Sequence, residues 1–426
     1  MLDAKILRES PSEVLSVYRE RLFDEDAAKL SQEALGFDEK RRNLLREADE
    51  LKNKRNSASQ TIGREKDPEK RAALIKEMES VKADISRLDA QLVETETQLN
   101  KLLLELPNLP DAEVPTGRTD AENRIVRTEG KAFSFDFSPK PHWELGEALG
   151  ILDFERGVKL SGSRFYLLKG AGARLQHAVI QFMLDMHVQK HGYTEIYPPF
   201  IVRSVNFETA GQLPKFYDNI YRDAEEDFML LGTAEIALTN VHRDEILEEA
   251  ELPIKYVAYT PCFRREKMSA GKDVRGIKRG HQFDKVEMYR YTTPETSFAA
   301  LEEMKQEAID ICEALGFPYR VLELATGDIS YASVKTYDIE VWAAGCGEWL
   351  EVSSASNCTD FQARRANVKY RPAEGGKTRI VHTLNASGLA LPRVMIALME
   401  NNQQADGSIV VPEALRPYMG GIEVIR

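Results

Sequence analysis

Two groups of polar and charged residues have the types and spacing expected for phosphate chemistry. The first joins Phe263-Arg-Arg-Glu266 to His281-Gln-Phe-Asp-Lys-Val-Glu287 through a loop rich in glycine, lysine and arginine. We expect two strands of a hairpin with a basic tip, with Phe283, Lys285 and Glu287 on one face of the returning strand. Arginine suits bidentate contact with phosphate, and an aromatic ring on the same surface suits stacking on a base. A hairpin with a solvated tip and cross-strand ion pairs would account for the same residues.

The second group lies closer to the C-terminus. It comprises Glu348-Trp-Leu-Glu-Val-Ser-Ser354, Asn385-Ala-Ser-Gly388 and Leu391-Pro-Arg393. Carboxylate and hydroxyl oxygens are hard ligands that suit Mg²⁺ between phosphates. Small residues ahead of a helix that begins near Pro392 would let a ligand approach the backbone closely. Taken singly, each of these segments is better explained by a structural role than by a functional one.

Several other chemistries are excluded by their missing motifs. The chain has no G-x-x-x-x-G-K-[ST] phosphate loop and no G-x-S-x-G elbow, and Gly170-Ala-Gly172 lacks the third glycine of a dinucleotide fingerprint. The spacing of the four cysteines matches neither a C-x-x-C metal clip nor a disulfide framework, so we expect reduced thiols in a cytosolic protein. They are Cys262, Cys312, Cys346 and Cys358. The first twenty residues lack the apolar core of a secretory signal, and no run of 18 apolar residues could span a membrane.

A heptad pattern organises the chain between Leu30 and Leu106. Steps of four and three residues link Leu30, Ala34, Phe37, Arg41, Leu44, Ala48, Leu51, Arg55, Ala58 and Ile62, and again Leu74, Met78, Val81, Ile85, Leu88, Leu92, Thr95, Leu99, Leu102 and Leu106. Between the two series, Gly63 is expected to stop a helix, and Asp67-Pro68-Glu69 has the composition of a helix start. We therefore predict an antiparallel helical hairpin, each helix about 50 Å long.

The outer half of this hairpin is basic. The segment 40–71 carries eleven Lys or Arg against six Asp or Glu, although the whole chain of 426 residues has a net charge of −12. Arg41 and Arg55 occupy seam positions where leucine would pack better. A phosphate-contacting arm, an oligomerisation or spacer arm, and a merely solvated face all fit this pattern.

Beyond two prolines at 107 and 110, strand-like runs alternate with single helices. We predict helices over 175–190, 234–247, 295–315 and 392–401, and strands over 194–197, 227–231, 254–263, 281–291, 349–352 and 379–384. Strands that follow one another through loops favour a mainly antiparallel sheet. Paired prolines after Tyr197 place the strand before them at an edge or interface.

In this order, the motifs together resemble those of class II aminoacyl-tRNA synthetases. They are Tyr-Pro-Pro199, Phe-Arg-x-Glu266 with its basic loop, His-Gln-Phe-x-Lys-Val-Glu287, Glu-Val-Ser-Ser354 and Asn-Ala-Ser-Gly-x-Ala-x-x-Arg393. The helical hairpin and Gly232-Thr-Ala-Glu235 make the chain most similar to the bacterial type of seryl-tRNA synthetases. The resemblance implies an α+β fold, an antiparallel sheet flanked by helices with an N-terminal coiled-coil arm. It also implies two domains, a tRNA-binding domain over 1–110 and a catalytic domain over 111–426.

The resemblance also assigns roles to matching residues. Arg264, on the α-phosphate, and Arg393, on the γ-phosphate, are the expected catalytic residues. The expected ATP-binding residues are Arg264, Arg265, Glu266, Phe283, Glu351, Val352, Ser353, Ser354 and Arg393. The expected serine-binding residues are Thr233, Ala234, Glu235, Arg279, Glu287, Asn385 and Ser387. Glu351 and Ser354 are the expected Mg²⁺ ligands, and no zinc is expected.

The implied reaction is ATP-dependent activation of serine followed by transfer of the seryl group to tRNA(Ser), and to tRNA(Sec) where a host has one. The implied partners are tRNA, through the arm and the basic loop, and a second copy of the chain in a cytoplasmic homodimer without a membrane. Two alternatives stay open: a ligase that loads a small amino acid onto a carrier protein, and a tRNA-binding protein with a degenerate site. The total charge, which by itself disfavours nucleic acid, averages an acidic body with a basic arm segment.

Overall fold

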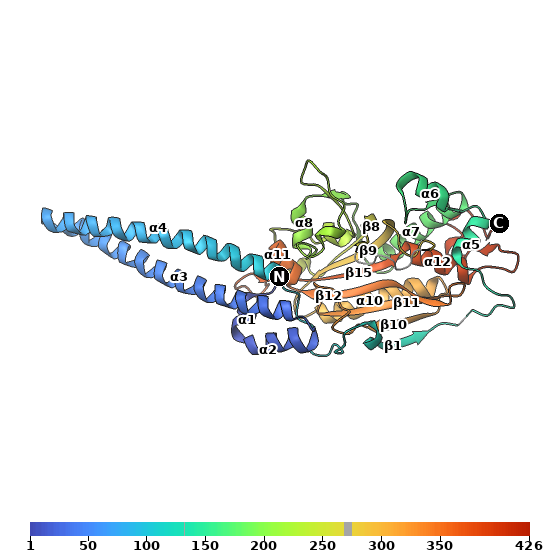
Figure 1. Ribbon diagram of the computed structural model, residues 1–426, viewed down its shortest axis with the longest axis horizontal. Helices are drawn as coiled ribbons and strands as arrows, with labels where there is room; N and C mark the ends of the chain where they lie inside the picture. The colour runs from blue at the N-terminus through green and yellow to red at the C-terminus, as the bar shows by residue number, and fades with distance from the viewer. Residues whose placement is uncertain (132, 268–274) are drawn as a thin grey trace. The chain divides into compact units, whose positions relative to one another are not determined.

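The computed structural model describes the whole chain except Ala132 and the segment 268–274. Contacts divide it into two compact units, Met1–Pro107 and Asn108–Arg426, and the elements of each are labelled in Figure 1. No helix among the described residues is long and apolar enough to cross a membrane.

A long helical hairpin forms most of the first unit. Helix α3 spans Glu25–Arg64 and helix α4 spans Pro68–Leu104, and they run antiparallel (Figure 1). The Asp67 carboxylate accepts hydrogen bonds from two backbone N–H groups of α4, and a proline occupies the first helical position. The predicted seam is confirmed, with Leu44, Ala48 and Leu88 buried, although Arg55 is exposed. The prediction that Gly63 stops the first helix is wrong, because α3 continues to Arg64.

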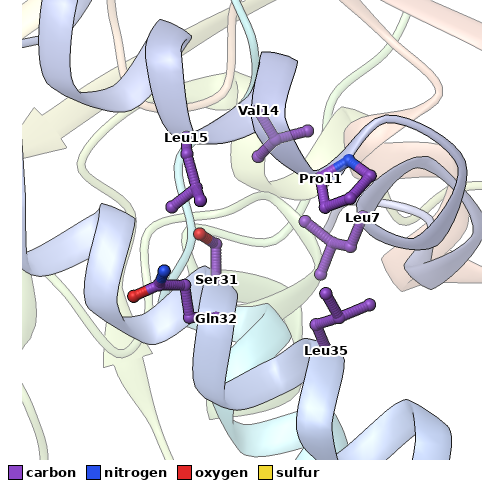
Figure 2. Close-up of a pocket in the computed structure, with 7 residues that line it drawn as sticks. All are labelled: Leu7, Pro11, Val14, Leu15, Ser31, Gln32 and Leu35. Carbon is purple, nitrogen blue, oxygen red and sulfur yellow. The ribbon is translucent and has the colours of Figure 1, made fainter.

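Two short helices precede the hairpin, α1 (Ala4–Glu9) and α2 (Pro11–Ser16), followed by a π-helical turn over Val17–Arg21. They contact α3 and enclose a small, almost wholly apolar hollow, shown in Figure 2. Its lining residues are Leu7, Pro11, Val14, Leu15, Ser31, Gln32 and Leu35. The fully buried Tyr18 donates its hydroxyl hydrogen to the Pro107 carbonyl at 3.0 Å, which ties the start of the chain to the end of the hairpin.

An eight-stranded sheet is the framework of the second unit. In spatial order its strands are β1 (Arg124–Glu129), β10 (Tyr319–Glu323), β11 (Lys335–Ala343), β12 (Glu348–Thr359), β15 (His382–Ala390), β9 (Gln282–Thr292), β8 (Ile254–Phe263) and β4 (Thr194–Glu195). Every neighbouring pair is antiparallel except β4 and β8. The predicted antiparallel sheet is therefore confirmed, and so is the edge position of the strand before Pro198.

Three longer helices pack on the sheet, and they are α7 (Ala171–Gln189), α10 (Ser297–Ala314) and α12 (Leu391–Asn401). Their buried faces and one face of the sheet form the largest apolar core. The shorter helices are α5 (His142–Ala148), α6 (Phe154–Ser161), α8 (Ser204–Thr209), α9 (Ala234–Leu238) and α11 (Phe361–Ala366). The small strands are β2 (Leu152–Asp153), β3 (Leu167–Leu168), β5 (Ile201–Val202), β6 (Met229–Leu230), β7 (Ile246–Glu248), β13 (Lys369–Arg371), β14 (Arg379–Ile380), β16 (Ile409–Val410) and β17 (Val424–Ile425).

The main error in the predicted elements lies after Ala234. A helix was predicted over 234–247, but α9 ends at Leu238, and the chain enters β7 at Ile246. Asp244 has a positive φ of 65°, which no helix continues through. The strand predicted over 349–352 is longer than expected, and that over 379–384 is split between β14 and β15. Strands β1, β10 and β11 were not predicted.

Candidate active site

Three neighbouring strands, β12, β15 and β9, carry eight of the sixteen predicted site residues, and Arg264 directly follows the next strand, β8 (Figure 1). The register places Ser387 opposite Glu287, and Cys262 opposite Phe283. Strand β9 pairs with β8 without irregularity, so Phe283, Lys285 and Glu287 share one face, as their spacing predicted. Segments more than a hundred residues apart in sequence thus meet on one surface.

Two β-bulges decide which side chains reach that surface. In β12 the register shifts between Glu351 and Ser353, so that Val352 and Ala355 both enter the apolar core although they are three residues apart. Glu351 and Ser354 consequently share the opposite face, where a regular strand would separate them. In β15 a second shift at Gly388 follows Ser387 in the same way.

Arg264 follows β8 directly and contacts the aromatic ring of the site. Its guanidinium carbon lies 5.1 Å from the Phe283 ring centroid, and its Nε donates to the Gly232 carbonyl at 3.1 Å. Its backbone N–H donates to the His281 carbonyl at 2.9 Å, which fixes the start of the loop against its end. Arg264 forms no ion pair with any carboxylate in the described part of the chain. Its charge can therefore be offered to an anion bound beside it.

The other end of the loop brings a second arginine to the site. Arg279 donates from Nη1 to Glu266 Oε2 at 3.1 Å, which joins the outgoing and returning segments. Glu266 has a positive φ of 51°, an uncommon conformation for a residue with a side chain. The backbone N–H of Arg265 donates to the Asn219 carbonyl. Burial raises the pKa of Tyr221, and the nearby charge of Arg265 partly opposes this. The loop tip over 268–274 lies outside the described residues.

Arg393, in the first turn of α12, contacts Glu351. Its Nη1 donates to the Glu351 carbonyl at 2.7 Å and lies 3.1 Å from the Glu351 carboxylate. Asp338 of β11 lies opposite Ser354 in the register. Burial and then the nearby Glu351 carboxylate raise the pKa of Asp338 well above its ordinary value, although a hydrogen bond with Ser354 opposes this. A buried oxygen of Asp338 accepts no hydrogen bond from the residues that the structure describes.

Two predicted ATP-binding residues direct their side chains elsewhere. Val352 is buried in the apolar core and is 1% exposed. The Ser353 hydroxyl donates to the Ser387 carbonyl at 2.6 Å and is also buried. These residues can contribute to a nucleotide site only through the backbone, because the bulge turns their side chains away from the shared face.

Charged residues that are largely buried lie close to Arg264. Lys285 Nζ lies 2.5 Å from Glu287 Oε2, and both side chains are less than 10% exposed. Glu235, on α9, accepts a hydrogen bond from Gln362 Nε2 at 2.6 Å. Burial, followed by repulsion from Glu287, raises the pKa of Glu235 to about 7. An ammonium group bound here would meet two carboxylates, one of which binds a proton near neutral pH.

Smaller residues lie around these charged side chains. Asn385 Nδ2 donates to Glu287 Oε1 at 3.4 Å, and Ser387 is the register partner of Glu287. The Thr233 hydroxyl accepts from the Glu235 backbone N–H at 3.3 Å and caps α9. Ala234 is fully buried, so its side chain serves packing rather than ligand contact. These side chains therefore bring together carboxylate, amide and hydroxyl groups suited to a small polar molecule.

Sequence reasoning missed three residues of this site. The period-two spacing placed Lys285 on the face of Phe283 and Glu287, but no role in the site was assigned to it. Asp338 and Gln362 come from β11 and α11, and no local pattern relates them to the other motifs. Cys346 was expected to lack a ligand cluster, but it lies beside His142 and Glu400.

Comparisons with known proteins agree with this geometry. The family model of the seryl-tRNA synthetase N-terminal domain matches residues 1–110, and that of the class II tRNA synthetase core domain (G, H, P, S and T) matches residues 216–402. The serine–tRNA ligase of Roseiflexus sp. (strain RS-1) is 58% identical over the full length of both chains.

Solved structures show the same relationship. Seryl-tRNA synthetase from Pyrococcus horikoshii, complexed with ATP, has a TM-score of 0.94 and 38% identity, covering 100% of this chain and 99% of its own. The cytoplasmic serine–tRNA ligase from Naegleria fowleri, in complex with AMP, has a TM-score of 0.88 and 30% identity at the same coverage.

Proposed function

The chain belongs to the seryl-tRNA synthetase family, and we propose that it joins serine to tRNA(Ser) in two steps driven by ATP. In the first step a serine carboxylate oxygen bonds to the α-phosphorus of ATP while the bond from that phosphorus to the pyrophosphate oxygen breaks. In the second step the seryl group passes to the terminal ribose of tRNA, and AMP leaves. The observation that carries this proposal is the position of Arg264 over Phe283, close to the buried carboxylates of Glu235 and Glu287.

The proposed chemistry needs no general base, since a carboxylate is already a nucleophile at neutral pH. Catalysis then depends on positioning and on charge stabilisation around the α-phosphate. Arg264 would neutralise charge on the α-phosphate, with the adenine stacked on Phe283. Arg279 would turn from Glu266 to the serine carboxylate, and Arg393 would hold the γ-phosphate.

The residues around Glu351 fit a magnesium ion. Glu351 and the Ser354 hydroxyl share one face, and the buried oxygen of Asp338 that lacks a hydrogen bond lies beside them. A group of hard oxygen ligands with incompletely compensated negative charge suits Mg²⁺. When bound, Mg²⁺ would offset the negative charge of the ATP phosphates. We propose no zinc in the reaction.

The side chains around Glu235 and Glu287 support selection of serine. The carboxylates of Glu235 and Glu287 would bind its ammonium and hydroxyl groups together with Asn385 and Thr233. Alanine would leave buried polar groups unpaired, which is costly, whereas threonine would have to be excluded by shape. A pyrophosphate-exchange assay with serine, alanine and threonine tests the assignment, and equal exchange with serine and alanine would refute it.

The first unit is proposed to bind tRNA. Arg55, Arg64 and Lys66 are exposed on the outer part of the hairpin and form no ion pair with the described residues. Exposed cations on a rigid arm suit contact with a phosphate backbone. The basic loop was also predicted to contact tRNA, but its segment 268–274 lies outside the residues that the structure describes. Family membership also supports a cytoplasmic homodimer. It gives no support to the two alternatives, a ligase that loads a carrier protein and a tRNA-binding protein with a degenerate site.

A further inference from the structure

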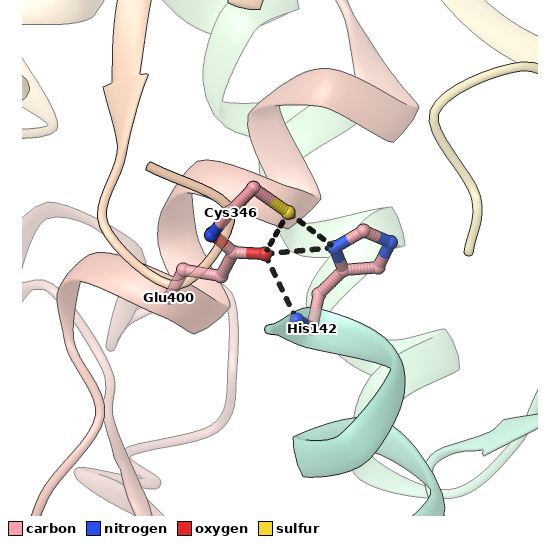
Figure 3. A group of neighbouring side chains, drawn as sticks. All are labelled: His142, Cys346 and Glu400. Atoms are coloured by element: carbon pink, nitrogen blue, oxygen red, sulfur yellow. Dashed lines mark hydrogen bonds and ion pairs between the residues drawn. The ribbon is translucent and has the colours of Figure 1, made fainter. Parts of the chain in front are cut away.

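His142, Cys346 and Glu400 form a buried polar cluster outside the proposed serine site, and Figure 3 shows how the three side chains meet. His142 begins α5, Cys346 lies in the turn between β11 and β12, and Glu400 lies near the end of α12. His142 is 1% exposed and Glu400 is fully buried. The proposed reaction uses none of the three, so their presence in the interior calls for an explanation.

Glu400 is surrounded by hydrogen-bond donors. Its Oε1 accepts from the backbone N–H and Nδ1 of His142, at 2.9 and 2.8 Å, and from Cys346 Sγ at 3.0 Å. Its Oε2 accepts from the backbone N–H groups of Gly345 and Cys346, at 2.9 and 2.8 Å. Burial raises the pKa of Glu400, but these hydrogen bonds outweigh it and hold the pKa below its ordinary value. A buried carboxylate with five donors is ionised and fully paired.

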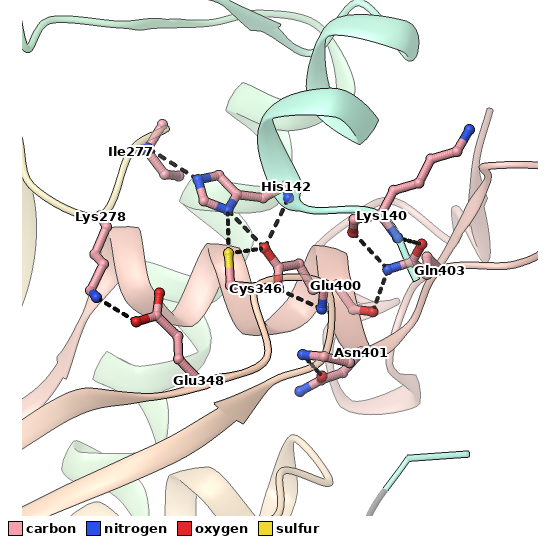
Figure 4. A network of polar contacts seen from close by, with 11 residues as sticks. Lys140, His142, Ile277, Lys278, Cys346, Glu348, Glu400, Asn401 and Gln403 are labelled. Atoms are coloured by element: carbon pink, nitrogen blue, oxygen red, sulfur yellow. Dashed lines mark hydrogen bonds and ion pairs between the residues drawn. The ribbon is translucent and has the colours of Figure 1, made fainter. Parts of the chain in front are cut away.

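The partners of His142 fix which nitrogen carries its hydrogen. An ionised carboxylate can only accept, so Nδ1 must donate to Glu400. The Ile277 backbone N–H can only donate, and it lies 3.1 Å from Nε2, so Nε2 must accept. His142 is therefore a neutral imidazole with hydrogen on Nδ1 and a hydrogen bond on each side (Figure 4).

This arrangement argues against a metal ion at the cluster. A histidine that binds a metal through Nδ1 carries hydrogen on Nε2 and donates it to an acceptor. Here Nε2 faces the backbone N–H of Ile277. With a metal on Nδ1, Nε2 would carry a hydrogen, and the two N–H groups would point at each other without an acceptor. The same hydrogen bond gives His142 a different role, because it connects the cluster to the loop between β8 and β9.

Four consecutive residues at the end of the loop between β8 and β9, positions 275–278, pack closely against their neighbours. Arg275 lies over the Trp143 ring at 4.9 Å, and Ile277 packs its side chain into the apolar core. Lys278 Nζ lies 2.8 Å from Glu348. Gly276 has a φ of +74°, and a Cβ there would lie 2.1 Å from His142 Nε2, so only glycine lets the loop approach the imidazole this closely.

The three segments joined by the cluster each lead to a residue of the proposed active site. Arg279 follows Ile277 by two residues, and Glu351 follows Cys346 by five. Arg393 precedes Glu400 by seven residues on α12, which is two turns and places both on one side of the helix. Arg393 and Glu351 also contact each other, so two of the three segments are joined at the active site as well as at the cluster.

We infer that His142 is a positioning residue for the activation of serine. By accepting the Ile277 hydrogen bond and donating to Glu400, it holds Arg279 in register with Arg393 and Glu351. This inference rests on the proposed function, but the position of the loop can be measured without any reaction.

Four variants of the full-length protein separate the two hydrogen bonds of His142. In H142N the amide nitrogen replaces Nδ1 and the acceptor for Ile277 is lost, whereas in H142Q the amide oxygen replaces Nε2 as that acceptor. G276A disturbs the same contact from the loop side without altering the core. G375A is its control, since Gly375 has a similar φ of +84° but no neighbour that an added Cβ would meet.

Hydrogen exchange of the 275–281 segment and steady-state pyrophosphate exchange are then measured for each variant. We expect H142N and G276A to speed amide exchange at Ile277 at least tenfold and to lower kcat/KM for serine-dependent exchange about tenfold. We expect H142Q to restore most of both properties and G375A to change neither. H242N is a second control, because His242 also bonds a carboxylate and a hydroxyl, Glu245 and Tyr256, away from the ATP site.

Three results would overturn the inference. One is unchanged amide exchange at Ile277 in G276A, and another is an equal loss of activity in H142Q and H142N. The third is one equivalent of bound metal in purified protein that disappears in C346S, which would make the cluster a metal site. Absence of serine-dependent exchange in the unaltered protein would refute the proposed function instead, while amide exchange would still test the contact.

Discussion

Charged residues pair in both units, but the surroundings of the pairs differ. Along the hairpin, Lys54 and Glu77 lie 2.7 Å apart across the two helices, and each side chain is at least half exposed. In the sheet, Lys285 and Glu287 lie 2.5 Å apart and are almost fully buried. An exposed pair gains little over hydration, whereas a buried pair cannot lose one member without leaving an uncompensated charge. We therefore expect the arm to tolerate charge changes that the site cannot.

Removing one member of the buried pair is the strongest test of that difference. Glu287→Ala should lower the free energy of unfolding of the second unit by about 3 kcal/mol or more, because Lys285 stays buried without a partner. All three tryptophans, Trp143, Trp342 and Trp349, belong to this unit, so their fluorescence during urea unfolding reports it alone.

The double variant E287A/K285M separates stability from function. It should recover most of the lost stability but not serine-dependent exchange, and KM for serine should rise more than KM for ATP. Recovery of serine use by the double variant would remove Glu287 from the proposed serine site.

Arg264→Ala tests a charge that no carboxylate among the described residues neutralises. Loss of a preorganised donor at the α-phosphate should lower serine-dependent pyrophosphate exchange about 100-fold or more, with little change in unfolding temperature. Arg203→Ala is a matched control, because Arg203 also lies over an aromatic ring, that of Phe228, but is exposed away from the site. If Arg264→Ala lowered serine-dependent pyrophosphate exchange by less than about threefold, Arg264 would be excluded from the mechanism.

The raised pKa of Glu235 predicts a smaller effect, on serine affinity. With a pKa of about 7, the ionised fraction rises from about one tenth at pH 6 to about nine tenths at pH 8. Since the serine ammonium favours the ionised form, affinity measured by calorimetry should increase about ninefold over this range. The Glu235→Gln variant should bind serine more weakly and without this dependence. Affinity that falls as the pH rises would contradict the role given to Glu235.

The folding consequence of the same carboxyl has the opposite sign. A pKa raised on folding means that the native state binds the proton more tightly than the unfolded state does. Glu235 therefore favours the folded state most below pH 4.5, and this contribution is lost as the pH rises toward 7. Serine binding and stability should thus respond to pH in opposite directions.

The smallest effect is expected in the arm. Lys54→Ala should change the stability of the hairpin by no more than about 0.5 kcal/mol, because its ion pair with Glu77 is exposed and screened by salt. Thermal melting followed by far-ultraviolet circular dichroism measures this change. If Lys54→Ala lowered the free energy of unfolding as much as Glu287→Ala is expected to, the proposed difference between exposed and buried ion pairs would be wrong.

The two units also differ in how far sequence determined their structure. The hairpin follows from a heptad repeat whose apolar residues meet across the two helices, so the spacing of those residues was enough to predict its seam. The strand over 254–263 was predicted with its observed bounds, and period two placed Phe283 and Glu287 together. These features depend on local alternation, which a single sequence displays.

The rest of the site depends on contacts between distant segments. The bulges near Val352 and Gly388 reverse strand alternation, so spacing alone assigns Glu351 and Ser354 to opposite faces. Asp338 enters the site through strand pairing, and His142 meets Glu400 across 258 residues of chain. No local pattern marks such pairs, because sheet register and helix packing are set by the whole unit.

The most direct test of the account compares two reactions in one shortened protein. Arg41 and Glu96 face each other across the hairpin at 2.9 Å, so a short glycine loop can join them and remove the basic outer arm. We predict that this variant keeps serine-dependent pyrophosphate exchange within about threefold of the full chain, since the sheet carries that step. Charging of tRNA(Ser) should fall at least about 100-fold, because the phosphate contacts of the arm are lost. Equal charging by the shortened and full-length proteins would contradict the division of labour proposed between arm and sheet.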